Sequence, residues 1–146
     1  MVSFPDAVKL FFKNYTNFQG RSRRSEYWWV QLFLLLVLIV PYILMFSVGG
    51  LASGEPNALG LGMLAIVGIF GLAIILPGIA LAVRRFHDLG QTGWLVLAFA
   101  VAGLIPIVGL IASIGQIVWF CFPGTNGPNK FGPDPRMGEV AADTFS

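Results

Sequence analysis

The sequence predicts an all-α, polytopic membrane protein in a single domain over residues 1–136. Of the 146 residues, 56% are hydrophobic and only 11% are charged, whereas a soluble domain is about 45–50% apolar and about 25% charged. Three long uncharged runs, at 27–54, 56–83 and 89–129, are separated by short polar segments. These observations predict four transmembrane helices, the last two short, preceded by an amphipathic helix.

The first expected helix, near residues 3–15, is amphipathic. Ser3 lies three residues before Asp6, a spacing typical of a helix N-cap. Apolar residues recur at helical spacing and share one face: Phe4, Val8, Phe11, Phe12 and Tyr15. Two interpretations remain open: this face either enters the lipid headgroup region or packs on the protein's own helices.

The first two uncharged runs each predict one full membrane span, near residues 27–49 and 59–84. Tyr27, Trp28 and Trp29 form an aromatic belt at the start of the first span. In the second span we expect Pro77 and Gly78 to interrupt the helix near its end.

The third run is too long for one span. A single helix over 89–129 would measure about 60 Å, against a hydrocarbon core of about 30 Å. Gly103, Pro106 and Gly109 mark the expected break, with short helices near 93–105 and 107–122. This hairpin either crosses a locally thinned bilayer or stops short as a re-entrant pair. The one cysteine, Cys121, is expected to be a buried apolar side chain.

The chain after the hairpin is polar and rich in turns. Its prolines and glycines exclude a helix over 123–136, and we expect residues 137–146 to be a disordered tail. With the two basic groups on the cytoplasmic side, the hairpin topology leaves all nine Lys and Arg residues inside, together with both termini. A three-span alternative would place Lys130 and Arg136 outside.

Two charged groups, at 21–26 and 84–88, should meet at one membrane surface, because the first two spans form a hairpin. We expect residues 129–135 to cover them. The candidate ligand-binding residues are Arg21, Arg24, Glu26, Arg84, Arg85, His87 and Asp88. Three roles are open: an ion-pair network that organises the helices, a site for an anionic ligand or lipid headgroup, and catalysis with His87 as a base.

The sequence argues against several other functions. One histidine, one cysteine and no paired acids at ligand spacing do not predict a metal site, and no cofactor motif is present. A net charge of +2 without a basic stripe does not predict nucleic-acid binding. The sequence contains no nucleophile at a spacing typical of an enzyme active site. The alternatives kept are a small oligomeric transporter or channel, and an enzyme acting on a lipid-linked substrate.

Four ordered motifs resemble domain-of-unknown-function family 805, small bacterial inner-membrane proteins of the YhaH type, over residues 5–136. The motifs are Phe18-x-Gly20-Arg21-x-x-Arg24-x-Glu26-Tyr27-Trp28, then Arg84-Arg85-x-His87-Asp88-x-Gly90-x-x-Gly93-Trp94, then Pro106 with Gly109, and Gly127-x-Asn129-x-Phe131-Gly132-x-Asp134-Pro135.

The resemblance implies a multi-pass protein of the bacterial inner membrane and brings no established activity, ligand or catalytic residue. The expected partners are the lipid bilayer, including anionic phospholipid, and a second copy of the chain. Besides the charged candidates, the motif residues for which we expect structural roles are Gly20, Trp28, Gly93, Trp94, Pro106, Asn129, Phe131, Gly132 and Pro135.

Overall fold

The computed structural model describes residues 1–137, and within them every regular element is a helix. The expected all-α class is therefore confirmed. Residues 138–146 of the expected disordered tail lie outside the described residues. In chain order the elements are α1 (Phe4–Lys13), α2 (Arg24–Ser47), the short 3-10 helix η1 (Leu51–Ser53), α3 (Ala58–Asp88), α4 (Leu95–Ala102) and α5 (Pro106–Cys121).

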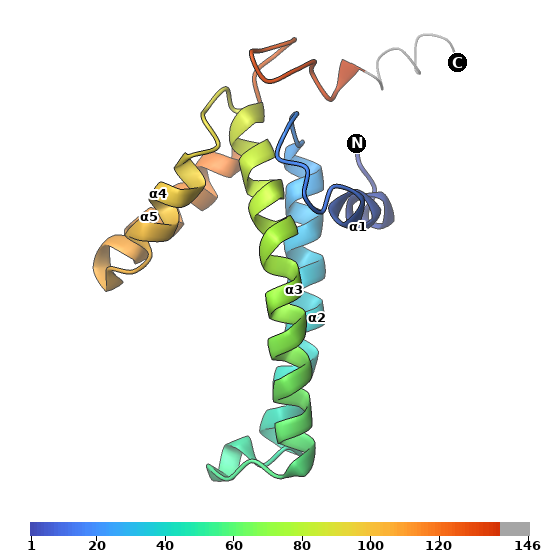
Figure 1. Cartoon of the computed structure of the whole chain (residues 1–146), viewed down its shortest axis with the longest axis vertical. Coiled ribbons are helices and arrows are strands. Elements are labelled where there is room, and N and C mark those ends of the chain that lie inside the picture. Colours follow the sequence, from blue (N-terminus) through green and yellow to red (C-terminus); the bar gives the residue numbers. More distant parts are fainter. Residues whose placement is uncertain (138–146) are drawn as a thin grey trace.

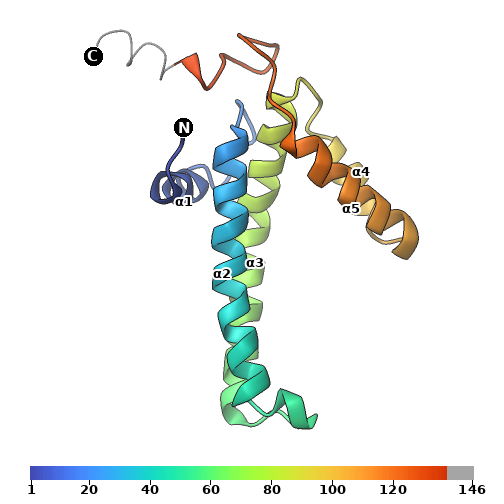
Figure 2. The same cartoon turned by 180° about the vertical axis from the view of Figure 1, so that it is seen from behind.

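The long helices α2 and α3 lie side by side as an antiparallel hairpin (Figures 1 and 2). Both are long and apolar enough to cross a membrane. α2 begins at Arg24 and α3 ends at Asp88, each about one turn beyond the predicted bounds. Both charged groups therefore lie at helix ends, and they lie at the same end of the hairpin.

The connection at the far end of the hairpin is tight. A Cβ on Gly60 would lie 2.2 Å from the carbonyl oxygen of Gly49, so only glycine permits this approach. Asn57 caps α3 by accepting a hydrogen bond from the backbone N–H of Gly60 at 3.0 Å.

The expected interruption at Pro77 and Gly78 is wrong, because α3 is continuous through both residues. A proline inside a helix leaves the carbonyl four residues earlier without its N–H donor. That carbonyl belongs to Ala73, and the hydroxyl of Tyr15 donates a hydrogen bond to it. A donor from the segment after α1 thus replaces the missing bond, which is how membrane helices tolerate proline.

α1 crosses α2 near the charged end of the hairpin (Figure 1). Ser3 caps it by accepting from the N–H of Asp6, as predicted. Ala7 and Phe11 are fully buried against Val30 and Leu81, whereas the ring of Phe12 is 43% exposed. The apolar face of α1 therefore packs mainly on the protein's own helices.

α4 and α5 form a hairpin that leaves the charged end of α3 and diverges from the long pair (Figures 1 and 2). Gly109 lets the two helices approach, since a Cβ there would lie 2.9 Å from the Cα of Gly103. A second core of Ala82, Phe86 and Phe120 joins the end of α3 to the end of α5. Cys121, next in the chain, is exposed, so its expected burial is wrong.

Candidate functional site

The two charged groups meet in a buried cluster centred on Asp88. Its Oδ1 lies 3.0 Å from Nε and 2.9 Å from Nη2 of Arg21, and its Oδ2 lies 2.5 Å from Nη1 of Arg85. All three residues are buried. Ion pairs that are desolvated and bonded in this way hold their partners firmly, and removing one partner is costly.

Arg85 also holds the end of α5. Its Nη2 donates to the carbonyl oxygens of Phe120, at 2.9 Å, and Phe122, at 2.6 Å. The last carbonyls of a helix have no partner inside the helix, so the guanidinium serves as a C-terminal cap supplied by another helix. Arg85 is fully buried and fixes the position of the α4–α5 hairpin relative to α3.

The neighbouring arginine joins α3 to the start of α2. Nη1 of Arg84 lies 3.2 Å from Oε1 of Glu26, and both residues are buried. The backbone N–H of Ser22 donates to the carbonyl of Arg84 at 3.0 Å. We use the name arginine cluster for five buried charged residues: Arg21, Glu26, Arg84, Arg85 and Asp88.

The chain directly after α5 covers the arginine cluster, through residues 124–127 rather than the expected 129–135. Thr125 donates its backbone N–H to the carbonyl of Asp88 at 2.8 Å. Arg21 donates to the carbonyls of Thr125 and Gly127, both at 2.6 Å. A Cβ on Gly124 would lie 1.9 Å from Oδ2 of Asp88, so this crossing requires glycine. We call residues 123–137 the tail segment.

A fourth ion pair shapes the tail segment itself. Nε of Arg136 lies 2.9 Å from Oδ1 of Asp134, and Nη2 lies 2.9 Å from Oδ2, a two-pronged contact. These bonds, with the backbone N–H groups of Arg136 and Gly127, hold the pKa of Asp134 well below its usual range and raise the pKa of Arg136.

His87 faces away from the arginine cluster. Its Nδ1 lies 3.1 Å from the carbonyl of Gly20, and its ring stacks on Phe131 with the centroids 3.9 Å apart. Asn129 donates its side-chain amide to the backbone carbonyl of His87 at 2.9 Å. The carboxylate of Asp88 binds arginines instead, so within residues 1–137 the backbone carbonyl of Gly20 is the group that orients the His87 ring.

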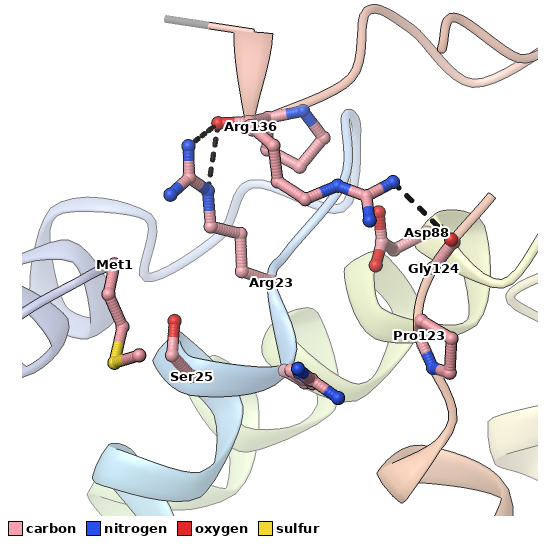
Figure 3. A pocket seen from close by; sticks show the side chains of 9 residues that line it. Met1, Arg23, Ser25, Asp88, Pro123, Gly124 and Arg136 are labelled. Atoms are coloured by element: carbon pink, nitrogen blue, oxygen red, sulfur yellow. Dashed lines mark hydrogen bonds between the residues drawn. The ribbon is translucent and has the colours of Figure 1, made fainter. Parts of the chain in front are cut away.

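A cavity of about 330 Å³ opens beside the arginine cluster (Figure 3). Its lining combines arginines from the start of α2 with the tail segment: Met1, Arg23, Arg24, Ser25, Asp88, Pro123, Gly124, Pro135 and Arg136. Arg23 donates to the carbonyl of Pro135, and Arg136 to that of Gly124. Within residues 1–137, no ion pair joins Arg24 to an acid.

A second hollow lies on a different side of the α3 end. It is an apolar groove of about 640 Å³ between α3 and α4, lined by Phe18, Ile79, Val83, His87, Thr92, Gly93, Trp94, Val96, Leu97, Ala100 and Phe131. Asp88 therefore faces the cavity of the tail segment, and its neighbour His87 faces the groove.

The arginine cluster is not electrically balanced. Three buried arginines face two buried acids, which leaves one positive charge uncompensated among these five residues. Four buried polar atoms have no hydrogen-bond partner within residues 1–137, and three belong to guanidinium groups: Nε and Nη2 of Arg84 and Nε of Arg85, with Oγ of Ser22. No group of three metal-ligating side chains occurs in this described range.

The sequence matches the family described as "Protein of unknown function (DUF805)" over residues 15–133. This chain belongs to the DUF805 family. The resemblance drawn from the four motifs is therefore confirmed. Inner membrane protein YhaH of Escherichia coli (strain K12) is 39% identical over 128 residues, which cover 86% of this chain and 92% of YhaH.

Inner membrane protein YhaI of the same strain is 37% identical over 127 residues, again 86% of this chain and 92% of the relative. Uncharacterized protein YiiR is 28% identical over 152 residues, covering 89% and 93%. No solved structure matches this DUF805 chain.

The DUF805 motifs occupy distinct places in the fold. Gly20 adopts a left-handed φ of 81° and presents its carbonyl to His87, and Gly132 also has a positive φ. Trp28 packs in the second core, and Pro106 begins α5. Gly93, Trp94 and Phe131 line the groove, while Asn129 and Pro135 bind His87 and Arg23.

Five of the seven charged candidates form the arginine cluster, while Arg24 lines the cavity and His87 lines the groove. The sequence interpretation placed Arg23 in the 21–26 group but not among the candidates, and it missed three further residues of the site: Gly124, Thr125 and Arg136. Their contacts are mostly to backbone carbonyls or depend on close backbone approach, and such contacts leave little trace in a sequence. The two-residue spacing of Asp134 and Arg136 was the one available signal.

Proposed function

We propose that the protein is an integral protein of the bacterial inner membrane whose charged end faces the cytoplasm and binds an anionic, phosphate-bearing ligand. The membrane location is supported by α2 and α3, which are long and apolar enough to span, and by the names of YhaH and YhaI. The charged end is assigned to the cytoplasm because it gathers the Lys and Arg residues.

We infer four membrane helices, of which α4 and α5 enter and return on the same side. α4 has 8 residues and α5 has 16, so they measure about 12 and 24 Å, less than the about 30 Å core. The contacts of Arg21 with Thr125 and Gly127 support a return to the cytoplasmic side, since they hold the tail segment at the charged end.

Cysteine accessibility tests this topology. Cys121 is exposed and is first replaced by serine. Single cysteines at Ser53, Thr92 and Thr125 are then labelled with a membrane-impermeant maleimide in intact cells and in inverted vesicles. We expect labelling at 53 only from the periplasm and at 92 and 125 only from the cytoplasm. A periplasmic residue 125 contradicts the returning hairpin.

The ligand proposal rests on one observation: Arg24 lines the cavity without an acidic partner, beside an arginine cluster that already carries excess positive charge. α2 begins at Arg24 beside this cavity, and the first N–H groups of a helix have no partner within the helix and favour anions. A planar guanidinium group can donate two parallel hydrogen bonds to two oxygens of one phosphate.

Equilibrium binding to the purified protein in detergent tests the proposal, with inorganic phosphate and glycerol phosphate as probes. Arg24→Gln should weaken binding about tenfold, the value of one charge-assisted hydrogen bond. Lys9→Gln removes the same charge from the exposed face of α1 and should leave binding unchanged. Equal affinities for the two variants, or no binding to the wild type, contradict the cavity as an anion site.

A further inference from the structure

The apolar groove between α3 and α4 is separate from the anion cavity, and the proposed function assigns it no role. Its volume of about 640 Å³ falls within the about 300–1,000 Å³ of small-molecule sites. Nearly all of its lining is apolar, and none of the lining side chains is acidic. From Ile79 to His87 the groove follows α3 for about 12 Å.

The two ends of the groove differ in chemistry. Toward the membrane interior its wall is Ile79 and Val83 of α3, with Leu97 and Ala100 of α4. At the charged end it closes on the stacked rings of His87 and Phe131. Gly93 brings the start of α4 against this wall, because a Cβ there would lie 2.6 Å from Val83.

A cation lies near this closed end, next to Phe131 and outside the groove lining itself. Nζ of Lys130 lies 5.0 Å from the centroid of the Phe131 ring, and Lys130 forms no ion pair within residues 1–137. Trp94, 76% exposed on the rim, has the amphipathic ring that favours the level of lipid headgroups. The groove is thus an apolar slot with one positive charge next to Phe131, a residue of its closed end.

We propose that the groove binds one acyl chain of an anionic phospholipid, with the headgroup phosphate beside Lys130. The apolar lining matches a hydrocarbon chain and the lysine complements the phosphate. The groove continues along α3 toward Leu72 and Ile75, which are exposed. A lipid acyl chain can therefore enter the groove sideways from the bilayer. This site is separate from the anion cavity and does not depend on it.

Photo-crosslinking tests the proposal directly. The full chain is reconstituted into phosphatidylcholine vesicles containing phosphatidylglycerol with a diazirine in one acyl chain, and labelled peptides are mapped by mass spectrometry. We expect labelling concentrated on the residues that line the groove between 79 and 100. Uniform labelling of all exposed apolar positions on α2, α3 and α5 means ordinary boundary lipid and overturns the proposal.

A large side chain inside the groove should exclude the lipid acyl chain. Ala100→Phe places a large ring in the slot and should lower groove labelling at least fivefold, whereas Ala98→Phe adds the same ring on the exposed opposite face of α4 and should not. Size-exclusion chromatography verifies that both variants fold. If both variants keep wild-type labelling, or if crosslinks to a second protein copy replace those to lipid, the proposal is wrong.

The charge at the closed end gives an independent measurement. With diazirine phosphatidylcholine as the second probe, Lys130→Gln should reduce the preference for phosphatidylglycerol about fivefold, while Lys130→Arg should retain it. Lys13→Gln, an equal charge change on α1, is the control. An unchanged preference in Lys130→Gln overturns the headgroup assignment. Arg24→Gln should leave groove labelling intact, which separates this site from the anion cavity.

Discussion

Arg21 and Asp88, 67 residues apart in the sequence, form a buried ion pair in which Nη2 of the arginine lies 2.9 Å from Oδ1 of the acid. The same carboxylate binds Arg85 through its other oxygen. One acid therefore joins the loop before α2, the end of α3 and, through Arg85, the end of α5. The charged end of the molecule is built around this carboxylate.

The contacts of residue 85 require an arginine at this position. Lysine keeps the charge but cannot reach Asp88 and the carbonyls of Phe120 and Phe122 together. Arg85→Lys should lower the free energy of unfolding by about 2–4 kcal/mol, the value of one or two lost charge-assisted bonds. Arg24→Lys, at an exposed position, is the control. Equal denaturation midpoints for the two variants in detergent contradict this role.

The crossing of Gly124 over Asp88 predicts a steric effect at one position. Gly124→Ala places a methyl group against the carboxylate, and overpacking of this kind costs about 1–3 kcal/mol. A Cβ on Gly115 of α5 meets no atom within 4 Å, so Gly115→Ala should be neutral or slightly stabilising. Thermal unfolding of the two variants compares them, and a Gly124→Ala midpoint matching that of Gly115→Ala rules out the close approach.

The hydrogen bond from Tyr15 to Ala73 predicts a non-additive pair of substitutions. Tyr15→Phe alone leaves the carbonyl freed by Pro77 without a donor and should cost about 1–3 kcal/mol. In a Pro77→Ala background the backbone N–H of residue 77 bonds that carbonyl, so Tyr15→Phe should cost much less. An equal cost in both backgrounds, measured by chemical denaturation, would show that the tyrosine does not compensate for the proline.

The lowered pKa of Asp134 predicts how attachment of the tail segment depends on pH. The folded-state pKa lies below the unfolded value, so the stabilisation is complete above about pH 4 and is lost as the pH falls further. The labelling rate of a single cysteine at Met137, in a Cys121→Ser background, is divided by that of a free thiol at the same pH, because only the thiolate reacts. This ratio should rise as the pH falls below about 4. Asp134→Asn should remove this dependence; identical profiles for both proteins contradict the assignment.

Hydropathy, charge spacing and turn residues were sufficient to predict the helices and their order. The meeting of the residue 21–26 and 84–88 groups followed from one inference, that two consecutive spans form a hairpin. The continuity of α3 through Pro77 could not be predicted in the same way, because the compensating donor is Tyr15, from a different element. Rescue by a distant side chain has no local sequence signal.

Within the site, the sequence predicted which residues are charged but not how they pair. His87 and Asp88 are adjacent in a five-residue group, yet a helix turns successive side chains by about 100°. One faces the groove and the other the arginine cluster. The contacts of Arg21, Arg23 and Arg85 with backbone carbonyls depend on where the tail segment lies, and composition does not specify that position.

The central claim is that the charged end is one coupled unit in which Asp88 neutralises Arg21. A double-mutant cycle with Arg21→Gln, Asp88→Asn and the double variant measures this coupling as the free energy of unfolding in detergent. We predict single losses of about 3–5 kcal/mol each and a coupling of about 2 kcal/mol or more. Losses that add to within about 0.5 kcal/mol would contradict the pairing on which the account of the site depends.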